Sequence, residues 1–299
     1  MILEKRIPLK YILKIIWKDI LFSTVFICMI VGFEHFFHFN FKLPVAIPAF
    51  LGTSISLILA FKLSQSYDRW WEARKIWGAI VNDSRTLIVQ LKSFSNYELE
   101  AQATIKRIAY RQIGWCYALC NTLRKLNALA PLTELVPATE LEALKEHSNV
   151  PLKLIDLNSR DIAALHKSNT INNFQQIQLD ETLLRLCASM GKSERIKNTV
   201  FPRIYRVFLK FFIYIFIITL AISLTEHLYP LIEVCLLTAI TLPFLLMERT
   251  AYYMQDPFEN RPSDTPIFTI SKTIEKNLRQ LLDEKDVDKV AVPDDYYIL

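Results

Sequence analysis

The chain has 299 residues, of which 52% are hydrophobic and 22% are charged, a composition too apolar for an ordinary soluble domain. Its formal net charge is +5, and the 35 basic residues are interspersed with 30 acidic ones without a long run of one sign, which argues against nucleic acid as a partner. Glycine is scarce, with 5 residues, and helix-favouring residues dominate, so we expect an all-α fold.

The N-terminal segment leads into a first predicted membrane helix. Residues 1–19 place basic side chains at helical spacing among apolar ones, which predicts an amphipathic lead-in on the cytoplasmic face. From about Ile20 to Phe37 the chain is apolar over nearly the roughly 20 residues that a spanning helix requires. Glu34 and His35 near its far end could line an outer mouth or lie among lipid headgroups, and both interpretations stay open.

A second span is expected from about Val45 to Leu63. Pro48 and Gly52 interrupt it early, which predicts a kinked or two-part helix beside a pore, because such breaks are tolerated in a membrane where a cavity or neighbouring helices satisfy the freed backbone groups. The alternative is a kinked packing helix with no pore. Three side chains recur every four residues and share one helical face, which makes that face the candidate pore lining: Thr53, Leu57 and Phe61.

The charge density rises after the second span, and residues 64–206 contain no further apolar stretch of membrane length. We expect a large helical cytoplasmic domain here. Its predicted elements are helices over Arg74–Phe94 and about Tyr97–Leu126, turns and a short helix over Ala130–Val150, and a helix over Ser168–Met190 that ends at Gly191.

Two more spans follow, at about Val207–Leu224 and Leu231–Met247, joined by residues 225–230, which contain no Lys or Arg. Basic residues flank the other ends, so the positive-inside rule places both termini and the central domain in the cytoplasm. The tail begins with a proline-containing turn and continues as a charged helix near Ile267–Glu284. The expected division is therefore 1–63 (lead-in and two spans), 64–206 (cytoplasmic domain), 207–254 (two spans) and 255–299 (C-terminal helix and tail).

The five cysteines are odd in number and form no C-x-x-C pair, so we expect neither a disulfide scaffold nor a zinc site. No glycine-rich phosphate loop, H-E-x-x-H or G-x-S-x-G motif is present, and we predict that the chain is not an enzyme and uses no cofactor.

A block at the end of the second span carries a family resemblance. Residues 66–74, Ser-Tyr-Asp-Arg-Trp-Trp-Glu-Ala-Arg, followed by Trp77-Gly78 and Asn82-Asp83-Ser84-Arg85, resemble the signature of bacterial bestrophin homologues. A second family marker is a turn just after the last span, which Asp256, Pro257 and Phe258 resemble. Within the first block, Arg69, Trp70 and Trp71 either anchor the helix at the membrane boundary or contact entering ions; we favour anchoring.

The resemblance implies a homopentamer with one ion pathway on its axis, in a bacterial inner membrane, with lipid, the permeant ions and further copies of the chain as its partners. It places the neck at Thr53, Leu57 and Phe61, where the family usually has three bulky apolar residues, so Thr53 is a departure. It also implies a lower constriction in the cytoplasmic domain, for which the candidates are Ile171, Phe174 and Ile177 on the Ser168–Met190 helix.

The expected function is passive conduction of small monovalent ions through a hydrophobic neck. The neck residues are neutral and choose neither sign of ion, so chloride is the nominal permeant ion by resemblance, and a sodium or potassium channel of the same fold is the alternative. A non-conducting membrane scaffold or receptor is the alternative of another class. Animal relatives carry a calcium clasp after the second marker, but Arg261 has the wrong charge for a calcium ligand, so we expect no metal here.

Overall fold

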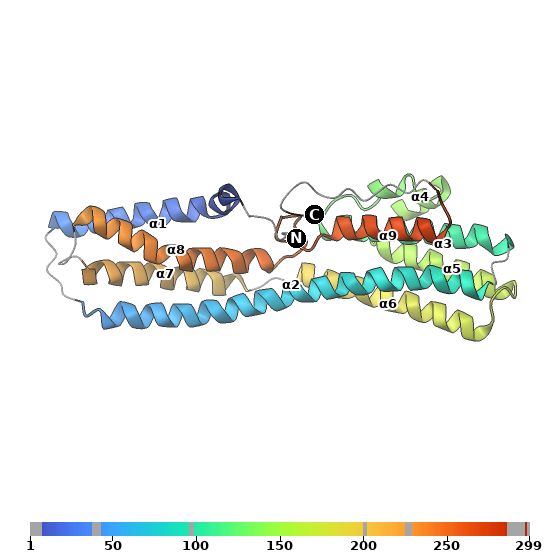
Figure 1. Ribbon diagram of the computed structural model, residues 1–299, viewed down its shortest axis with the longest axis horizontal. Coiled ribbons are helices and arrows are strands. Elements are labelled where there is room, and N and C mark those ends of the chain that lie inside the picture. The colour runs from blue at the N-terminus through green and yellow to red at the C-terminus, as the bar shows by residue number, and fades with distance from the viewer. Residues whose placement is uncertain are drawn as a thin grey trace. The chain divides into compact units, whose positions relative to one another are not determined.

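A computed structural model describes residues 8–37, 43–95, 99–199, 202–224, 229–285 and 297 of the chain. Helices make up almost all of the described chain, which confirms the all-α prediction (Figure 1). In order they are α1 (Leu9–Phe37), α2 (Ala46–Phe94), α3 (Leu99–Leu123), the 3₁₀ turn η1 (Ala130–Leu132), α4 (Ala138–Lys145), α5 (Val150–Lys167), α6 (Asn173–Asn198), α7 (Arg203–Leu224), α8 (Pro230–Met254) and α9 (Ile267–Leu281).

Four of the described helices are long and apolar enough to cross a membrane, as the sequence predicts. They are α1, α2, α7 and α8. In α2 the apolar part is the first half, and the helix then continues as a polar one to Phe94. From Leu9 onward the predicted lead-in and the first span form one continuous helix, α1.

Of the predicted kinked or two-part helix, the two-part form is wrong, because α2 is one helix of 49 residues, and a kink stays a prediction. Pro48 is its third residue, and in the first turn a proline removes no intrahelical hydrogen bond. Gly52 serves a packing role instead. A Cβ atom added there would lie 3.1 Å from Cε2 of the Phe216 ring in α7, so the missing side chain leaves room for that ring.

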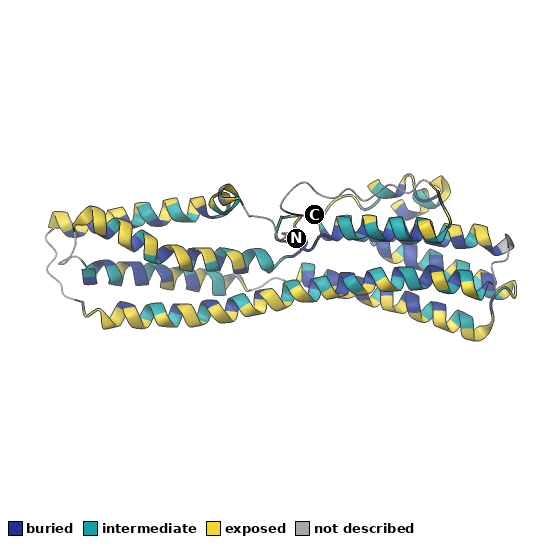
Figure 2. Cartoon of the chain, in the orientation of Figure 1, coloured by how far each residue is buried: buried dark blue, intermediate teal, exposed yellow. Residues whose placement is uncertain are grey.

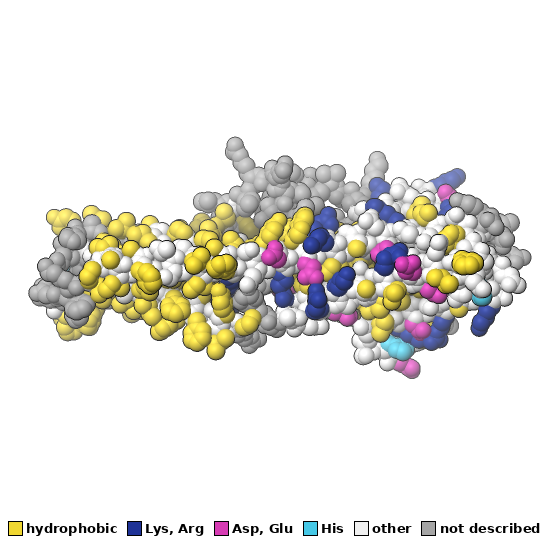
Figure 3. All heavy atoms as spheres, turned by 90° about the horizontal axis from the view of Figure 1, so that it is seen from below, with side chains coloured by type: hydrophobic (Ala, Val, Ile, Leu, Met, Phe, Trp, Pro, Cys, Tyr) yellow, Lys and Arg dark blue, Asp and Glu magenta, His cyan; other side chains and the backbone are white. Residues whose placement is uncertain are grey.

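The described chain divides into two compact units. Among the described residues, those within 8–70 and 202–255 form the membrane unit, and those within 71–199 and 256–285, with residue 297, form the polar unit. On the face shown in Figure 3, hydrophobic side chains dominate the membrane unit, whereas Lys, Arg, Asp and Glu gather on the polar unit. Helix α2 contributes its first half to one unit and its second half to the other.

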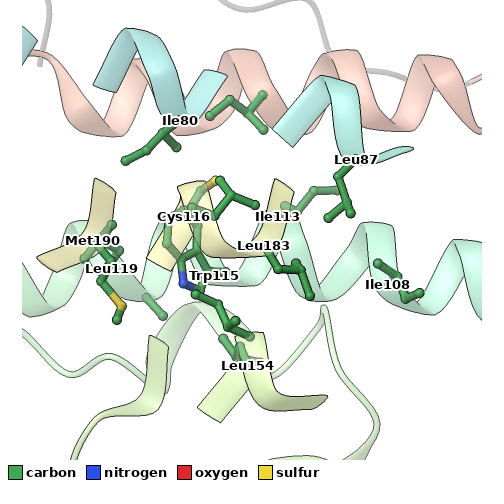
Figure 4. Packing of buried hydrophobic residues seen from close by; sticks show 14 of the residues in the cluster. Ile80, Leu87, Ile108, Ile113, Trp115, Cys116, Leu119, Leu154, Leu183 and Met190 are labelled. Carbon is green, nitrogen blue, oxygen red and sulfur yellow. The ribbon is translucent and has the colours of Figure 1, made fainter. Parts of the chain in front are cut away.

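Each unit has its own apolar core. In the membrane unit the inward faces of all four helices contribute, with Ile27 and Val31 from α1, Ile55 and Leu59 from α2, Ile213, Phe216 and Ile217 from α7, and Leu237 and Leu245 from α8. In the polar unit α3 is the central helix, and its fully buried Ile113, Trp115, Cys116 and Leu119 pack with Ile80 and Leu87 of α2, Leu154 of α5, and Leu183 and Met190 of α6 (Figure 4).

Helix boundaries in the polar unit differ from the prediction after Val150. Helix α5 was not predicted from the sequence; it begins where the Asn149 side chain accepts a hydrogen bond from the Leu152 N–H at 3.0 Å. Helix α6 begins later than predicted, at a capping box in which Asn172 and Gln175 each bond the other's backbone N–H. It then continues through Gly191 to Asn198, so that glycine is not a helix stop.

Several predicted features lie outside the described residues. These are the first seven residues of the lead-in with Lys5 and Arg6, most of the link before α2, residues 225–228 of the loop between α7 and α8, and the polar end of the tail.

We predict opposite effects of two glycine-to-alanine substitutions. A Cβ atom at Gly114 of α3 would lie 2.7 Å from Cδ2 of the fully buried Leu132, whereas a Cβ atom at Gly191 would have no described atom within 4 Å beyond its chain neighbours and its own helix backbone. Gly191→Ala should raise the melting temperature, because alanine favours a helix by about 1 kcal/mol over glycine. Gly114→Ala should lower it, because overpacking a core costs about 1–3 kcal/mol. Thermal unfolding of both purified variants in detergent checks this, and equal melting temperatures would contradict the packing at Leu132.

Candidate functional site

The three predicted neck residues lie on one open face of α2 in the membrane unit. The side chains of Leu57 and Phe61 are 59% and 61% exposed, and Thr53 is also exposed. Figure 2 shows such exposed positions recurring along α2. The opposite face buries Ile55 and Leu59 in the apolar core. A single chain therefore leaves this part of α2 uncovered, while the role of the three residues as a pore lining stays a prediction.

Hydroxyl groups on this part of α2 are satisfied within the helix itself. Thr53 Oγ1 donates to the Ala49 carbonyl at 2.9 Å, and Ser56 Oγ donates to the Gly52 carbonyl at 2.8 Å. Because its one hydroxyl proton is engaged, Thr53 has no donor left for a passing ion or water molecule. Thr53 therefore differs less from the bulky apolar residue expected at this position than its hydroxyl group suggests.

The candidates for a lower constriction are separated by the structure. Ile171 precedes α6 and is only 2% exposed, packed in the core of the polar unit. A side chain buried in this way cannot also line a water-filled path, so Ile171 is not kept as a candidate. Phe174 and Ile177, one helical turn apart at the start of α6, are 80% and 63% exposed.

The signature block at the end of the second span, residues 66–74, holds the end of α8. Arg69 Nε donates to the Gln255 carbonyl at 2.6 Å, and Gln255 Nε2 donates to Ser66 Oγ at 3.4 Å. Helix α8 ends at Met254, so Arg69 neutralises the partial negative charge of the last carbonyls there. Trp70 stacks on Tyr67 with ring centroids 6.0 Å apart, and Trp71 is half-exposed. These contacts join α2 to the end of α8, and anchoring at a membrane boundary stays a prediction.

The turn after α8 is closed by a lysine. Lys197 Nζ donates to Asp256 Oδ2 at 2.8 Å and to Glu259 Oε1 at 2.5 Å, while Phe258 and Pro257 are buried. The bond from Lys197 holds the pKa of Glu259 down at about 2. Burial raises the pKa of Asp256. Asp256, Pro257 and Phe258 therefore form an ordered turn in the polar unit.

The same turn leads into the place where animal relatives would bind calcium. Asp256 and Glu259 already share the Lys197 ammonium group, and Asp264 Oδ2 accepts the Arg261 N–H at 3.0 Å. Within the described residues, no group of three or more His, Cys, Asp or Glu side chains could hold a metal ion. The charge compensation that an acidic turn requires is supplied here by the chain's own lysine and arginine.

Two ionic triads in the membrane unit were not predicted from the sequence. In the first, Glu248 Oε1 lies 3.1 Å from Lys62 Nζ and 3.3 Å from Arg206 Nε. In the second, Asp19 lies 3.2 Å from Lys210 Nζ and 3.7 Å from Arg249 Nε. One signal was available, since an ionisable residue such as Lys62 within an apolar span is rare unless it has a partner or a function. The partner itself, 186 residues away, could not be found from local spacing.

Comparison with known proteins identifies relatives over nearly the whole chain. The family model described as bacterial/fungal bestrophin protein matches residues 7–280. The voltage-dependent anion channel-forming protein YneE of Escherichia coli O157:H7 is 27% identical over 284 residues, 94% of this chain and 90% of the relative. A protein of Nostoc sp. with the same description is 26% identical, over 87% of this chain and 86% of its own. The crystal structure of a bestrophin homologue from Klebsiella pneumoniae superposes with a TM-score of 0.82 at 26% identity, covering 90% of this chain and 99% of that one.

We predict that Asp264 makes the folded protein less stable as the pH rises from 4 to 6. Burial raises the pKa of this carboxyl to about 6 from its ordinary 3.8. In that interval the folded chain binds more protons than the unfolded chain, so the free energy of unfolding falls with pH, by on the order of 2–3 kcal/mol in all. Asp264→Asn keeps an oxygen for the Arg261 N–H and does not ionise, so its melting temperature in detergent should fall less between pH 4.5 and 7.

Asp156→Asn is the matched control. The hydrogen bond from Lys153 holds the pKa of Asp156 below its ordinary value, so neutralising it should not reduce the loss of stability above pH 4.5. If the melting temperatures of wild type and Asp264→Asn fell equally across this pH range, the buried carboxyl would be excluded as the cause of the loss of stability.

Proposed function

We propose that this chain, which belongs to the bacterial and fungal bestrophin family, forms an ion channel whose narrowest path is lined by Thr53, Leu57 and Phe61. The chain is a channel-family protein and not an enzyme. The observation that carries the proposed path is the open face of α2. In a helix apolar enough to span a membrane, the large side chains of Leu57 and Phe61 are left uncovered by the other helices of the membrane unit.

The proposed mechanism is control of wetting. Rings of Leu57 and Phe61 side chains resist entry of water when they are close together, and ions pass when the rings separate. No covalent step takes part. The hydroxyl of Thr53 is bonded to the Ala49 carbonyl, so the outermost ring presents a methyl group and oxygen lone pairs rather than a hydrogen-bond donor.

We assign small anions, with chloride as the nominal case, to this path. The support is that relatives matched along most of their length are described as voltage-dependent anion channel-forming proteins. The three neck residues are neutral and leave the sign of the ion to charges elsewhere in the molecule. A monovalent cation channel of the same fold is the alternative outcome of the bilayer experiment.

The proposed assembly is a homopentamer around the path. A single chain cannot enclose a path with one helical face, and repetition of one heterologous interface around a rotation axis closes a ring. The polar unit also has uncovered apolar side chains, with Phe174, Ile177 and Leu184 exposed along α6. In a ring, we expect Phe174 and Ile177 to form the lower constriction.

The proposed location is a bacterial inner membrane, with both termini cytoplasmic. Among the described residues, the ends of the spans next to the polar unit in sequence are rich in Lys and Arg, including Arg69, Arg206, Lys210 and Arg249. The described residues at the opposite ends include Glu34, His35 and Glu233 and no Lys or Arg. This asymmetry is what the positive-inside rule requires.

Conduction is tested by comparing two phenylalanines in planar lipid bilayers. Phe61 and Phe211 are similarly exposed, at 61% and 58%, but only Phe61 lies on the proposed path. Under a KCl gradient, wild type should reverse near the chloride equilibrium potential. Phe61→Ala should carry severalfold more current, because removal of a large apolar ring lowers the barrier to wetting. Phe211→Ala should conduct like wild type.

The possible outcomes separate the alternatives. A reversal potential near that of potassium keeps the path and assigns it to cations. Equal currents from all three proteins would remove Phe61 from the narrowest point. No current from an oligomeric wild-type protein would replace the channel with a membrane scaffold.

Assembly is tested by native mass spectrometry of the detergent-solubilised protein. The expected species has five times the 34.9 kDa mass of the chain. A denatured sample, which should give the single-chain mass, is the control, and a native monomer or dimer would contradict the proposed ring.

A further inference from the structure

The two ionic triads of the membrane unit share one design. Each has a single carboxylate between two cations: Glu248 between Lys62 and Arg206, and Asp19 between Lys210 and Arg249. All four helices of the unit contribute, α1 through Asp19, α2 through Lys62, α7 through Arg206 and Lys210, and α8 through Glu248 and Arg249. Four cations face two carboxylates, so the triads leave an excess of two positive charges in each chain.

These charges are withdrawn from solvent to different degrees. The Lys62 and Glu248 side chains are 1% and 3% exposed, and the other four are between 17% and 33% exposed. The Arg206 guanidinium lies 4.0 Å from the centre of the Tyr252 ring, which covers it further. Charges surrounded by apolar helices are poorly screened, so their field extends well beyond contact distance.

The first triad lies next to the proposed neck. Lys62 directly follows Phe61, so along the helix axis the two residues are separated by about 1.5 Å. Lys62 points into the bundle, where it is buried, while Phe61 is on the uncovered face. The neck side chains are neutral. The nearest charged group on α2 is therefore the Lys62 ammonium group, which is buried in the bundle and does not lie on the uncovered face.

We propose that the excess positive charge of the two triads sets the ion preference of the channel in favour of anions, with Lys62 as its main determinant and Glu248 as the opposing one. The inference rests on the proposed conduction path. A positive field behind an apolar constriction lowers the energy of an anion in the constriction and raises that of a cation. The triads thus supply a selectivity that the neck residues lack.

A purely structural role makes a different prediction. If the pair only holds α2 against α8, removing either partner breaks that link and disturbs the neck in the same way. If the field matters, the two removals act in opposite directions, because one lowers the net charge and the other raises it.

The test is the chloride-to-potassium permeability ratio, taken from reversal potentials in planar bilayers under a KCl gradient. We expect the ratio to fall severalfold in Lys62→Met and to rise severalfold in Glu248→Gln. The double variant, Lys62→Met with Glu248→Gln, keeps the net charge of the triad and should return to near the wild-type ratio. Where Lys62→Met does not assemble, Lys210→Gln makes the same change of charge at a less buried position and should also lower the ratio.

Arg160→Gln is the control, because it removes an exposed positive charge from α5 in the polar unit and should leave the ratio unchanged. Shifts in the same direction for Lys62→Met and Glu248→Gln would overturn the inference, as would an unchanged ratio in both. Such results leave the conduction path intact. Absence of current from wild type would instead remove the path and the inference together.

Discussion

The continuity of α2 constrains the rest of the structure. Over residues 46–70 this helix belongs to the membrane unit and over residues 71–94 to the polar unit, yet its hydrogen-bonded backbone is unbroken for 49 residues. In an apolar environment every break in a helix exposes backbone groups that lipid cannot satisfy. The two helix-disfavouring residues therefore lie where they do not interrupt the helix. Pro48 is in the first turn, and Gly52 leaves room for the Phe216 ring of α7.

An uninterrupted helix also fixes which side chains share a face. Once Ile55 and Leu59 are buried in the membrane unit, the 100° step between residues sets the direction of Thr53, Leu57 and Phe61. The buried Lys62 and its bond to Glu248 add a polar constraint to this apolar one. A rotation of α2 that covered Phe61 would move Lys62 out of its buried position and separate it from its carboxylate. The ion pair and the apolar core thus specify the same rotational setting.

Much of this could be predicted from the sequence, because membrane helices leave strong local signals. The four spans and the open face of α2 follow from apolar runs and periodicity. The failures have a common cause. Gly191 has the same local signal whether it ends a helix or lies within one. The burial of Ile171 depends on the assembled core of the polar unit, and the course of α5 depends on packing against α3. The ion pairs join residues far apart in sequence, which periodicity cannot detect.

The bond from Thr53 Oγ1 to the Ala49 carbonyl has a consequence for how related sequences are compared. A hydroxyl that donates to its own helix leaves threonine close to valine in shape, with no outward donor, and the two then differ only in the oxygen lone pairs of threonine. If Thr53 lines the proposed path, selection for ion passage would distinguish the two residues only weakly at this position. Exchange of threonine for valine in a homologue is therefore poor evidence that the homologue has acquired a different physiological role.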